Sequence, residues 1–433
     1  MKIFLKRITE IWDRLFLEER PSIGLSFFRI AVALTVGFHV IPTLFNLSDN
    51  YYATAFKTYN LHFFTPEVIT LVQKSPDGVV LLFTFLFYIF WFFFLIGLWS
   101  QISCILMVGT CYYFYALNAF HVGTLSWDIL LVTLFLMCLT PYQGDYFSAD
   151  CLLRGDPEAY KRKRPFYLQR LLQLQIASTF FYTALYKVSA AGNWIKDNPI
   201  YYLMNTPPAG VTKYFLLRDW FAVHPTACYI AGITIIICEF SLPFLLFFPR
   251  TRLSAIYLGT FFHIVLILTL DVPAIFFFLF PPQLLLFIHP AKIVHWIEVK
   301  RRVNSQASQS QLIYDGHCGF CLASVNMLKV MDLFGCVKMV DFQTVGDIQH
   351  LHATLTKEKC MSQIHLVEPD GALYGGFEAF RRLCLVKPML YPMLLIVYFP
   401  GMGVIGPRIY QWIAKNRYFL HFNKICQDHA CFR

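Results

Sequence analysis

Long apolar segments are the feature that most limits how this chain can fold. A helix that crosses a bilayer needs about 20 predominantly apolar residues. Because lipid offers no hydrogen-bond partners, the backbone of each crossing segment must satisfy itself, and a helix does so. The sequence therefore predicts a polytopic α-helical membrane bundle of about eight spans, at 23–45, 79–99, 102–122, 126–144, 169–190, 226–248, 252–270 and 273–289.

The composition changes near Lys292, and this change divides the chain. The whole chain is 57% hydrophobic and 14% charged, whereas soluble domains are about 45–50% apolar and about 25% charged. After Lys292, charged and amide residues return at the density of a soluble domain. We therefore expect an amphipathic N-terminal segment at 1–20, a membrane domain at 21–290, a basic and polar linker at 291–310, and a small domain with an amphipathic tail at 311–433.

The net charge of +10 reflects basic residues at the ends of the apolar segments. They gather at 154–170, 250–252 and 300–302, and the positive-inside rule places such groups in the cytoplasm. With eight spans and a cytoplasmic N-terminus, all three groups lie on one side, so both termini are predicted to be cytoplasmic. An odd number of spans would place the C-terminal domain on the opposite side of the membrane. The expected partner is the lipid bilayer, and nucleic acid is excluded.

Cys318 and Cys321 form a Cys-x-x-Cys pair in the C-terminal domain. The pair stands where a strand expected at 311–314 gives way to a helix expected at 318–334. The N-terminus of a helix stabilises a thiolate through its partial positive charge. The spacing therefore predicts dithiol–disulfide chemistry, with Cys318 as the more exposed, attacking thiolate and Cys321 as the resolving thiol.

Asp315 and His317 complete the candidate catalytic site. Asp315 is expected either to accept a proton from a thiol or to fix the turn, and His317 to raise the reduction potential by stabilising the thiolate. Half of a zinc site and inert structural cysteines are the two alternatives. Zinc needs four ligands, and no second Cys-x-x-Cys or Cys-x-x-His lies nearby, so the sequence predicts no metal.

The segments after the cysteine pair predict the rest of the small domain. Strands are expected at 337–342, 362–368 and 372–374, with a Pro-Asp-Gly turn at 369–371 and a helix at 377–385. The order of strand, Cys-x-x-Cys, helix, strand, hairpin and helix predicts a small α/β thioredoxin-like domain.

This domain resembles the DCC thiol–disulfide oxidoreductase family, named for an Asp-x-x-Cys-x-x-Cys motif found here at 315–321. The resemblance extends to Tyr-Gly-Gly-Phe-Glu-Ala-Phe at 374–380 and to Ile-Tyr-Gln-Trp-Ile-Ala-Lys-Asn-Arg-Tyr at 409–418, and it covers about residues 311–422. It implies an oxidoreductase whose partner is a protein or small molecule carrying a thiol or disulfide. It specifies no substrate.

Ionisable residues inside apolar segments are costly, which makes them candidates for function. Each also has a structural interpretation, such as an ion pair within the bundle, a span end in contact with water, or a hydrogen-bonded core histidine. The residues concerned are Arg29, Asp128, Lys187, Glu239, His263 and Asp271.

Several short motifs occur along the membrane part, namely Phe-Arg-Ile at 28–30, Tyr-Phe-Ser-Ala-Asp at 146–150, the segments at 173–188 and 193–194, and Phe-His at 262–263. Through these motifs the membrane part, over about residues 20–290, resembles the HTTM domain family, which includes the vitamin K-dependent gamma-glutamyl carboxylase. The resemblance implies that Lys187 is the base that deprotonates a reduced quinone of the vitamin K type. We expect Arg29, Asp128 and His263 to line the ligand site together with Lys187.

Glutamate carboxylation itself is not expected. Trp127 and Asp128 stand where the carboxylase has a histidine, and a compact domain replaces its luminal substrate-recognition region. The favoured hypothesis is a membrane-bound thiol–disulfide oxidoreductase whose bundle binds a quinone or lipid. The alternatives are a quinol-coupled enzyme centred on Lys187 and a non-enzymatic accessory module for peptide maturation.

Overall fold

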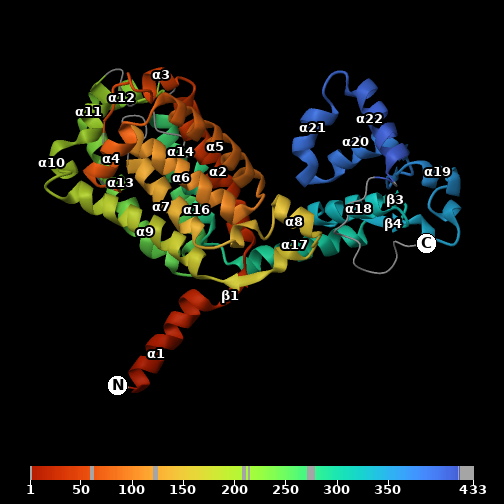
Figure 1. Cartoon of the computed structure of the whole chain (residues 1–433). Helices are drawn as coiled ribbons and strands as arrows, with labels where there is room; N and C mark the ends of the chain where they lie inside the picture. Colours follow the sequence, from red (N-terminus) through yellow and green to blue (C-terminus); the bar gives the residue numbers. More distant parts are fainter. Residues whose placement is uncertain are drawn as a thin grey trace. The chain divides into compact units, whose positions relative to one another are not determined.

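A computed structural model describes residues 2–58, 63–119, 125–206, 211–212, 215–270, 278–417 and 419 of the chain. The chain divides into two compact units (Figure 1). Unit 1 comprises Met1–Ser148 and Arg162–Pro290, and unit 2 comprises Ala149–Lys161 and Ala291–Arg433. Unit 1 thus comprises residues up to Pro290 apart from the short segment Ala149–Lys161, which belongs to unit 2.

Unit 1 is mainly helical, as its apolar segments predict (Figure 1). A π-helical turn, η1 (Asp13–Leu17), follows the first helix, and strands β1 (Glu19–Pro21) and β2 (Lys163–Pro165) form a short antiparallel pair. The helices are α1 (Lys2–Trp12), α2 (Ile23–Leu44), α3 (Leu47–Asn50), α4 (Pro66–Gln73), α5 (Asp77–Ile96), α6 (Ser100–Leu117), α7 (Leu125–Cys138), α9 (Tyr167–Val188), α10 (Trp194–Asp197), α11 (Pro199–Asn205), α12 (Arg218–Val223), α13 (Pro225–Phe247), α14 (Arg252–Thr269) and α16 (Phe280–Leu285).

Five helices among the described residues are long and apolar enough to cross a membrane, namely α2, α5, α6, α13 and α14. The predicted number of about eight is therefore not confirmed. Helix α7 has only 14 residues. Helix α9 has 22 residues, but it includes three glutamines and Arg170. The last predicted span, at 273–289, falls partly outside the described residues, and its described part contains the six-residue helix α16.

Helix α2 lies at the centre of the core of unit 1. Of its apolar window, 67% is buried, compared with 22% for α5 and α14 and 28% for α13. Phe28 and Val32 of α2 are fully buried and share a hydrophobic cluster with Phe87 of α5 and Phe114 of α6. The more exposed apolar helices are those expected to face lipid, where hydrocarbon chains take the place of core side chains.

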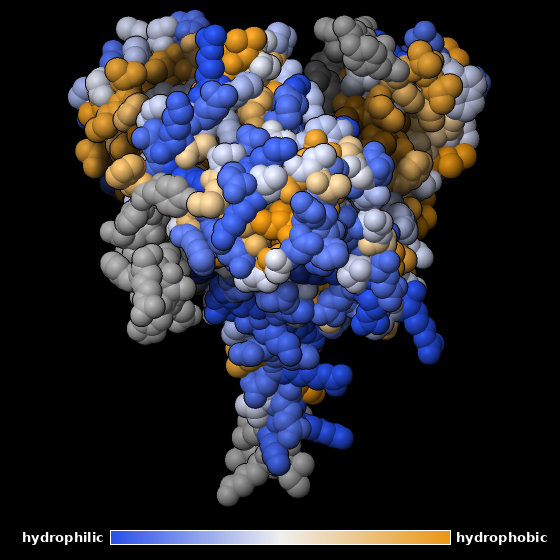
Figure 2. Space-filling view, turned by 90° about the vertical axis from the view of Figure 1, so that its right-hand side faces the viewer, coloured by the Kyte–Doolittle hydropathy of each residue, from blue (hydrophilic) through white to orange (hydrophobic). Residues whose placement is uncertain are grey.

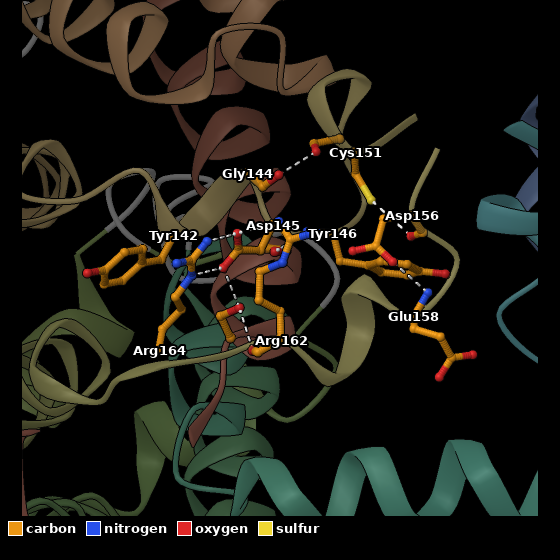
Figure 3. Close-up of polar contacts among 12 residues, drawn as sticks. Tyr142, Gly144, Asp145, Tyr146, Cys151, Asp156, Glu158, Arg162 and Arg164 are labelled. Carbon is orange, nitrogen blue, oxygen red and sulfur yellow. Dashed lines mark hydrogen bonds and ion pairs between the residues drawn. The ribbon is translucent and has the colours of Figure 1, made fainter. Parts of the chain in front are cut away.

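A buried carboxylate, that of Asp145, joins the ends of the two short strands (Figure 3). Arg164 donates to it through Nε at 2.9 Å and Nη2 at 3.0 Å, and Arg162 donates through Nη1 at 3.4 Å. The Ser22 hydroxyl, next to β1, donates to the same carboxylate at 2.7 Å. This hydrogen bonding by Asp145 raises the pKa of Arg164, and the shared carboxylate holds the ends of the two strands together.

Unit 2 contains a four-stranded mixed sheet with the order β4-β3-β5-β6 (Figure 1). Strand β3 pairs in parallel with β4 and antiparallel with β5, and β5 pairs antiparallel with β6. The predicted order of elements is therefore confirmed. The strands are β3 (Ser310–Tyr314), β4 (Val337–Asp341), β5 (His365–Val367) and β6 (Leu373–Gly375), and the helices are α8 (Ala149–Arg154), α17 (Pro290–Gln306), α18 (Gly319–Met331), α19 (Lys357–Ser362), α20 (Gly376–Val386), α21 (Tyr391–Val397) and α22 (Met402–Asn416).

The segment predicted as a linker at 291–310 is instead mostly helix α17. Its Trp296 ring contacts Phe334 edge-on at 5.4 Å between centroids, and Asn304 donates to the carbonyl of Phe334 at 2.8 Å. Ile297 is 1% exposed. The helix therefore packs as part of unit 2, and its charged residues are those of the solvated side of an amphipathic helix.

Both faces of the sheet are covered. Leu312 and Leu366 belong to a cluster with Leu383 of α20, and Ile313 and Val367 belong to a second cluster with partners that precede β5. Successive residues of a strand point to opposite faces, so adjacent apolar residues supply two cores. This packing fixes the end of β3, from which the cysteine pair emerges.

Helices α21 and α22 leave apolar side chains uncovered. Leu395 and Phe399 are 82% and 66% exposed, and Trp412 is 62% exposed. The face shown in Figure 2 is mainly hydrophilic, with hydrophobic residues gathered in separate patches. Exposed apolar side chains of this kind suit a membrane surface.

Candidate active site

Cys318 is the N-cap residue of α18, directly after the loop that leaves β3. Its backbone has φ −92° and ψ 111°, outside the helical region. The Cys318 Sγ accepts a hydrogen bond from the backbone N–H of Cys321 at 3.3 Å. The pair thus occupies one turn, with the first sulfur at the positive end of the helix dipole, as the spacing predicts.

The burial of the pair differs from the prediction. Cys318 is 0% exposed and Cys321 is 7% exposed, so the expectation that Cys318 is the more exposed thiol was wrong. The reason is geometric, because the N-cap side chain turns back over the first turn to accept from Cys321. A substrate disulfide can therefore reach this sulfur only if the adjoining segments move.

The two thiols differ strongly in acidity. A hydrogen bond from the Cys321 thiol, assisted by the Cys321 N–H and the Arg417 guanidinium, lowers the pKa of Cys318 to about 7, although burial opposes it. Donation to Cys318, together with burial, raises the pKa of Cys321. A thiolate with a low pKa attacks disulfides efficiently near neutral pH, and the neighbouring thiol then resolves the mixed disulfide that forms.

Asp315 fixes the turn that carries the pair. This residue is 3% exposed, and its Oδ1 accepts from the His317 N–H at 3.1 Å and from Gln343 Nε2 at 3.0 Å. Its Oδ2 lies 3.7 Å from Arg417 Nη2. Of the two roles expected for Asp315, the structure shows the contacts of the turn, and the role as proton acceptor stays a prediction.

Gly316 is required by the close approach of Asp341. A Cβ atom at position 316 would lie 1.9 Å from Asp341 Oδ2, which is far inside van der Waals contact. The carboxylate of Asp341 accepts from the Gly316 N–H at 3.0 Å and from the Gln343 N–H at 3.0 Å. The end of β4 therefore holds the loop after β3 directly, and only glycine leaves room for this contact.

His317 lies beside the pair but is exposed. Its backbone N–H, bonded to Asp315, is its connection to the turn. The thiolate-stabilising role expected for its ring stays a prediction.

Helix α22 and the residue directly after it supply two side chains near the pair, and both lie in the 409–418 motif. The Tyr410 hydroxyl accepts from the Ile364 N–H at 3.0 Å. Arg417 is 5% exposed, faces Asp315, and donates to the carbonyl of Met361. Sequence reasoning quoted Arg417 only as part of a motif and did not consider Asp341 or Gln343. A usable signal for the last two was their place at the end of a strand parallel to β3, where polar side chains converge.

In unit 1, Lys187 of α9 pairs with Glu239 of α13. The Lys187 Nζ lies 2.5 Å from the Glu239 carboxylate, and the two side chains are 14% and 8% exposed. The ammonium also lies 4.9 Å from the ring centroid of Trp194. Lys187 is therefore held at the edge of the bundle with its charge matched by a carboxylate.

The other candidate residues of the bundle lie in different surroundings. Arg29 is buried and donates to carbonyls at the end of α5, those of Phe94 and Leu95, and to those of Gln143 and Phe147. These bonds supply partners that a helix C-terminus otherwise lacks.

Asp128 accepts from the Tyr115 hydroxyl at 2.9 Å. The ring of His263, 2% exposed, lies 4.9 Å from that of Phe280 between centroids. The structure thus brings Lys187 to Glu239 and not to Arg29, Asp128 or His263. The sixth candidate, Asp271, lies outside the described residues.

Comparison with known proteins identifies both parts of the chain. The family model of the HTTM domain matches residues 19–291, and that of the DCC1-like thiol-disulfide oxidoreductase matches residues 312–422. An uncharacterized chloroplastic protein of Arabidopsis thaliana is 32% identical over 108 residues, which are 25% of this chain. The match spans 50% of the length of that relative. No solved structure matches the chain.

Proposed function

The chain belongs to the HTTM domain family and carries a DCC1-like thiol-disulfide oxidoreductase domain, and from this premise we propose that it is a membrane-bound enzyme acting through Cys318 and Cys321. The observation that carries the proposal is the geometry of the pair: Cys318 caps the start of α18, and its Sγ accepts from the Cys321 N–H at 3.3 Å. The opposite directions in which the two thiol pKa values move agree with this arrangement. The strand order β4-β3-β5-β6 with the pair at the start of α18 supports a thioredoxin-like arrangement.

The proposed reaction is a two-electron exchange. The Cys318 thiolate attacks one sulfur of a substrate disulfide, and the other substrate sulfur leaves as a thiolate, which takes up a proton. Cys321 then loses its proton and attacks Cys318 Sγ, which releases the second substrate thiol and leaves a Cys318–Cys321 disulfide. The substrate is reduced, the pair is oxidised, and the reverse sequence oxidises a dithiol. The partner in this proposal is a protein or a small thiol compound.

The direction of exchange depends on the compartment. Our proposal keeps the basic ends of the spans, both termini and the C-terminal domain in the cytoplasm, in accord with the positive-inside rule. This placement requires an even number of crossings, and so at least one crossing segment besides the five long apolar helices. A reducing cytoplasm favours reduction of the substrate over net disulfide formation.

The pH dependence of alkylation tests the proposed nucleophile. In the full-length protein, the rate of Cys318 modification by iodoacetamide, followed by mass spectrometry, should rise with a midpoint at about pH 7. Below this pH the sulfur is a thiol, and above it the sulfur is a reactive thiolate, whereas an ordinary cysteine reaches its midpoint near about pH 8.5. Burial slows the absolute rate, so the midpoint is the quantity to compare.

Two variants make this measurement specific. Cys321→Ala removes the main donor to Cys318 and should move the midpoint upward. Cys360→Ala, which removes another buried thiol of unit 2, should leave it unchanged. A midpoint above about pH 8 in the unaltered protein, or no reversible disulfide between roughly −120 and −270 mV, would contradict the proposal.

We extend the proposal to the membrane unit, where we expect a quinone to bind. A hollow of about 300 Å³ lies along α7 and α9, lined by Asp128, Gln175, Thr179 and Thr183 with apolar neighbours. Small-molecule sites begin at about this size. Thr183 is one helical turn before Lys187 on α9. A quinone held here would be an oxidant or reductant for the cysteine pair.

Filling the hollow tests the quinone proposal. Thr179→Leu should weaken binding of menadione to the full-length protein about tenfold, because overpacking costs roughly 1–3 kcal/mol. Thr234→Leu is the matched control. The hydroxyls of Thr179 and Thr234 each donate to the carbonyl four residues earlier, but Thr234 is exposed on α13, away from the lining of the hollow. Equal menadione binding by the two variants would show that the hollow is not the binding site. Activity lost in Lys187→Met but retained in Cys318→Ser would instead support the quinol-coupled enzyme centred on Lys187.

A further inference from the structure

Three arginines of unit 1 converge on one small hollow that the proposed reaction does not use. Arg20, Arg170 and Arg252 line it together with Phe166, Gln173 and His289. No acidic side chain contributes to this lining among the described residues. We propose that this arginine hollow binds the phosphate of an anionic lipid headgroup.

The charge in the arginine hollow is only partly compensated. Arg20 donates through Nη2 to Glu18 at 2.6 Å, and Glu18 is 48% exposed at its side chain. The one carboxylate bonded here therefore faces three guanidinium groups. Like charges held this close favour an anion, and guanidinium groups match the geometry of phosphate oxygens.

Each arginine keeps a donor for such an anion. The Nε of Arg20 is buried without a hydrogen-bond partner. Arg170 uses Nε and Nη1 for Leu15 and Gln173, and Arg252 uses Nε and Nη2 for the carbonyls of Leu246 and Phe247. These bonds hold both groups in place and leave Arg170 Nη2 and Arg252 Nη1 without a bond to a described residue.

The surroundings add to the positive potential and orient the groups. Phe166 is the N-cap of α9 and Arg252 is the first residue of α14, so the positive ends of two long helices meet at the hollow. The Arg20 and Arg170 guanidiniums lie 4.4 Å and 5.0 Å from the Phe166 ring centroid. Aromatic stacking of this kind holds a guanidinium in a fixed position.

The size and place of the hollow favour a lipid over a free compound. Its volume is about 20 Å³, and since one water molecule needs about 10–15 Å³, it admits phosphate oxygens while the rest of the ligand stays outside. Arg252 opens α14, a helix suited to crossing the membrane. The hollow therefore lies at a span end, where basic pockets meet lipid headgroups.

Ligand-dependent thermal unfolding of the full-length protein in an uncharged detergent tests the proposal. Dioctanoyl phosphatidic acid should raise the unfolding midpoint saturably, and dioctanoyl phosphatidylcholine should not. Arg20→Gln should weaken the apparent affinity for phosphatidic acid about tenfold, as expected for one charge-assisted hydrogen bond. Arg250→Gln removes an exposed charge two residues before Arg252 and should leave the affinity unchanged.

The remaining outcomes separate the alternatives. Arg20→Lys keeps the charge and should restore part of the affinity, which distinguishes anion binding from a folding defect, and each variant's unliganded midpoint reports its folding. Stabilisation by inorganic phosphate equal to that by phosphatidic acid at the same concentration would overturn the lipid assignment in favour of a soluble phosphate compound. Equal losses in Arg20→Gln and Arg250→Gln, or equal stabilisation by phosphatidylcholine, would overturn the site itself.

Discussion

Cys318→Ser is expected to abolish thiol–disulfide exchange, with a loss on the order of 10³-fold or more, as when other enzymes lose their nucleophile. A serine hydroxyl is not ionised at neutral pH, whereas the pKa of Cys318 is about 7. The measurement is reduction of a fluorescent disulfide peptide by the reduced full-length protein. The cysteine pair lies in unit 2, so this substitution should leave the helical bundle of unit 1 folded.

Cys321→Ser should behave differently from Cys318→Ser. It leaves the attacking sulfur in place but removes the resolving thiol, so a mixed disulfide with the substrate should accumulate and be visible by mass spectrometry. Cys384→Ser, at a thiol whose pKa burial raises to about 11, is the matched control and should retain exchange. Full cellular function in a Cys318→Ser and Cys321→Ser double variant would instead indicate a non-enzymatic accessory module.

Asp145→Ala is expected to destabilise unit 1 by about 1–3 kcal/mol, the effect of losing hydrogen bonds to a charged group. The side chains of Arg162 and Arg164 are 26% and 36% exposed, so water compensates part of the loss. The change leaves Arg162 and Arg164 without the carboxylate they share and removes the acceptor for Ser22. The measurement is the unfolding midpoint of the full-length protein in detergent. Separation of β1 from β2 should accompany the loss.

A second variant shows whether the unpaired charge causes this loss. Asp145→Ala combined with Arg164→Ala removes the main orphaned guanidinium and should recover part of the stability. Glu10→Ala, at an exposed carboxylate of α1, should change the midpoint little. Equal effects of Asp145→Ala and Glu10→Ala would show that the Asp145 cluster contributes nothing beyond ordinary surface charge.

The order of elements in the small domain could be predicted from the sequence because its signals are local. The apolar run at 312–313, the turn at 369–371 and the cysteine spacing each lie within a few residues, and the structure confirms the sheet they imply. The contacts of Asp315 with Gln343 and Arg417 could not be predicted in this way. These partners are 28 and 102 positions away along the chain, and only the fold brings them together.

The membrane unit shows the same limit. Lys187 and Glu239 were each singled out as ionisable residues, but their pairing across 52 positions depends on the packing of α9 against α13. The number of spans could not be predicted from composition alone. Helix α9 contains glutamines, and their effect on a span depends on partners such as the carbonyl of Leu286, to which Gln173 donates. In the same way, the charges of α17 suggested a linker although Ile297 of this helix is buried.

The division of the chain has a mechanical consequence for the cysteine domain. The backbone crosses between the two units three times, after Ser148, after Lys161 and after Pro290. A domain joined by one linker can rotate freely about it. A domain joined by three connecting segments can rotate much less, because the segments restrain one another. Within unit 2, Glu158 of the inserted segment is also bonded to Lys161 and lies 3.8 Å from Arg301 of α17. A single protease cut after Pro290 should therefore leave residues 291–433 held to the inserted segment through such contacts, and cuts at all three crossings are needed to release unit 2 with that segment.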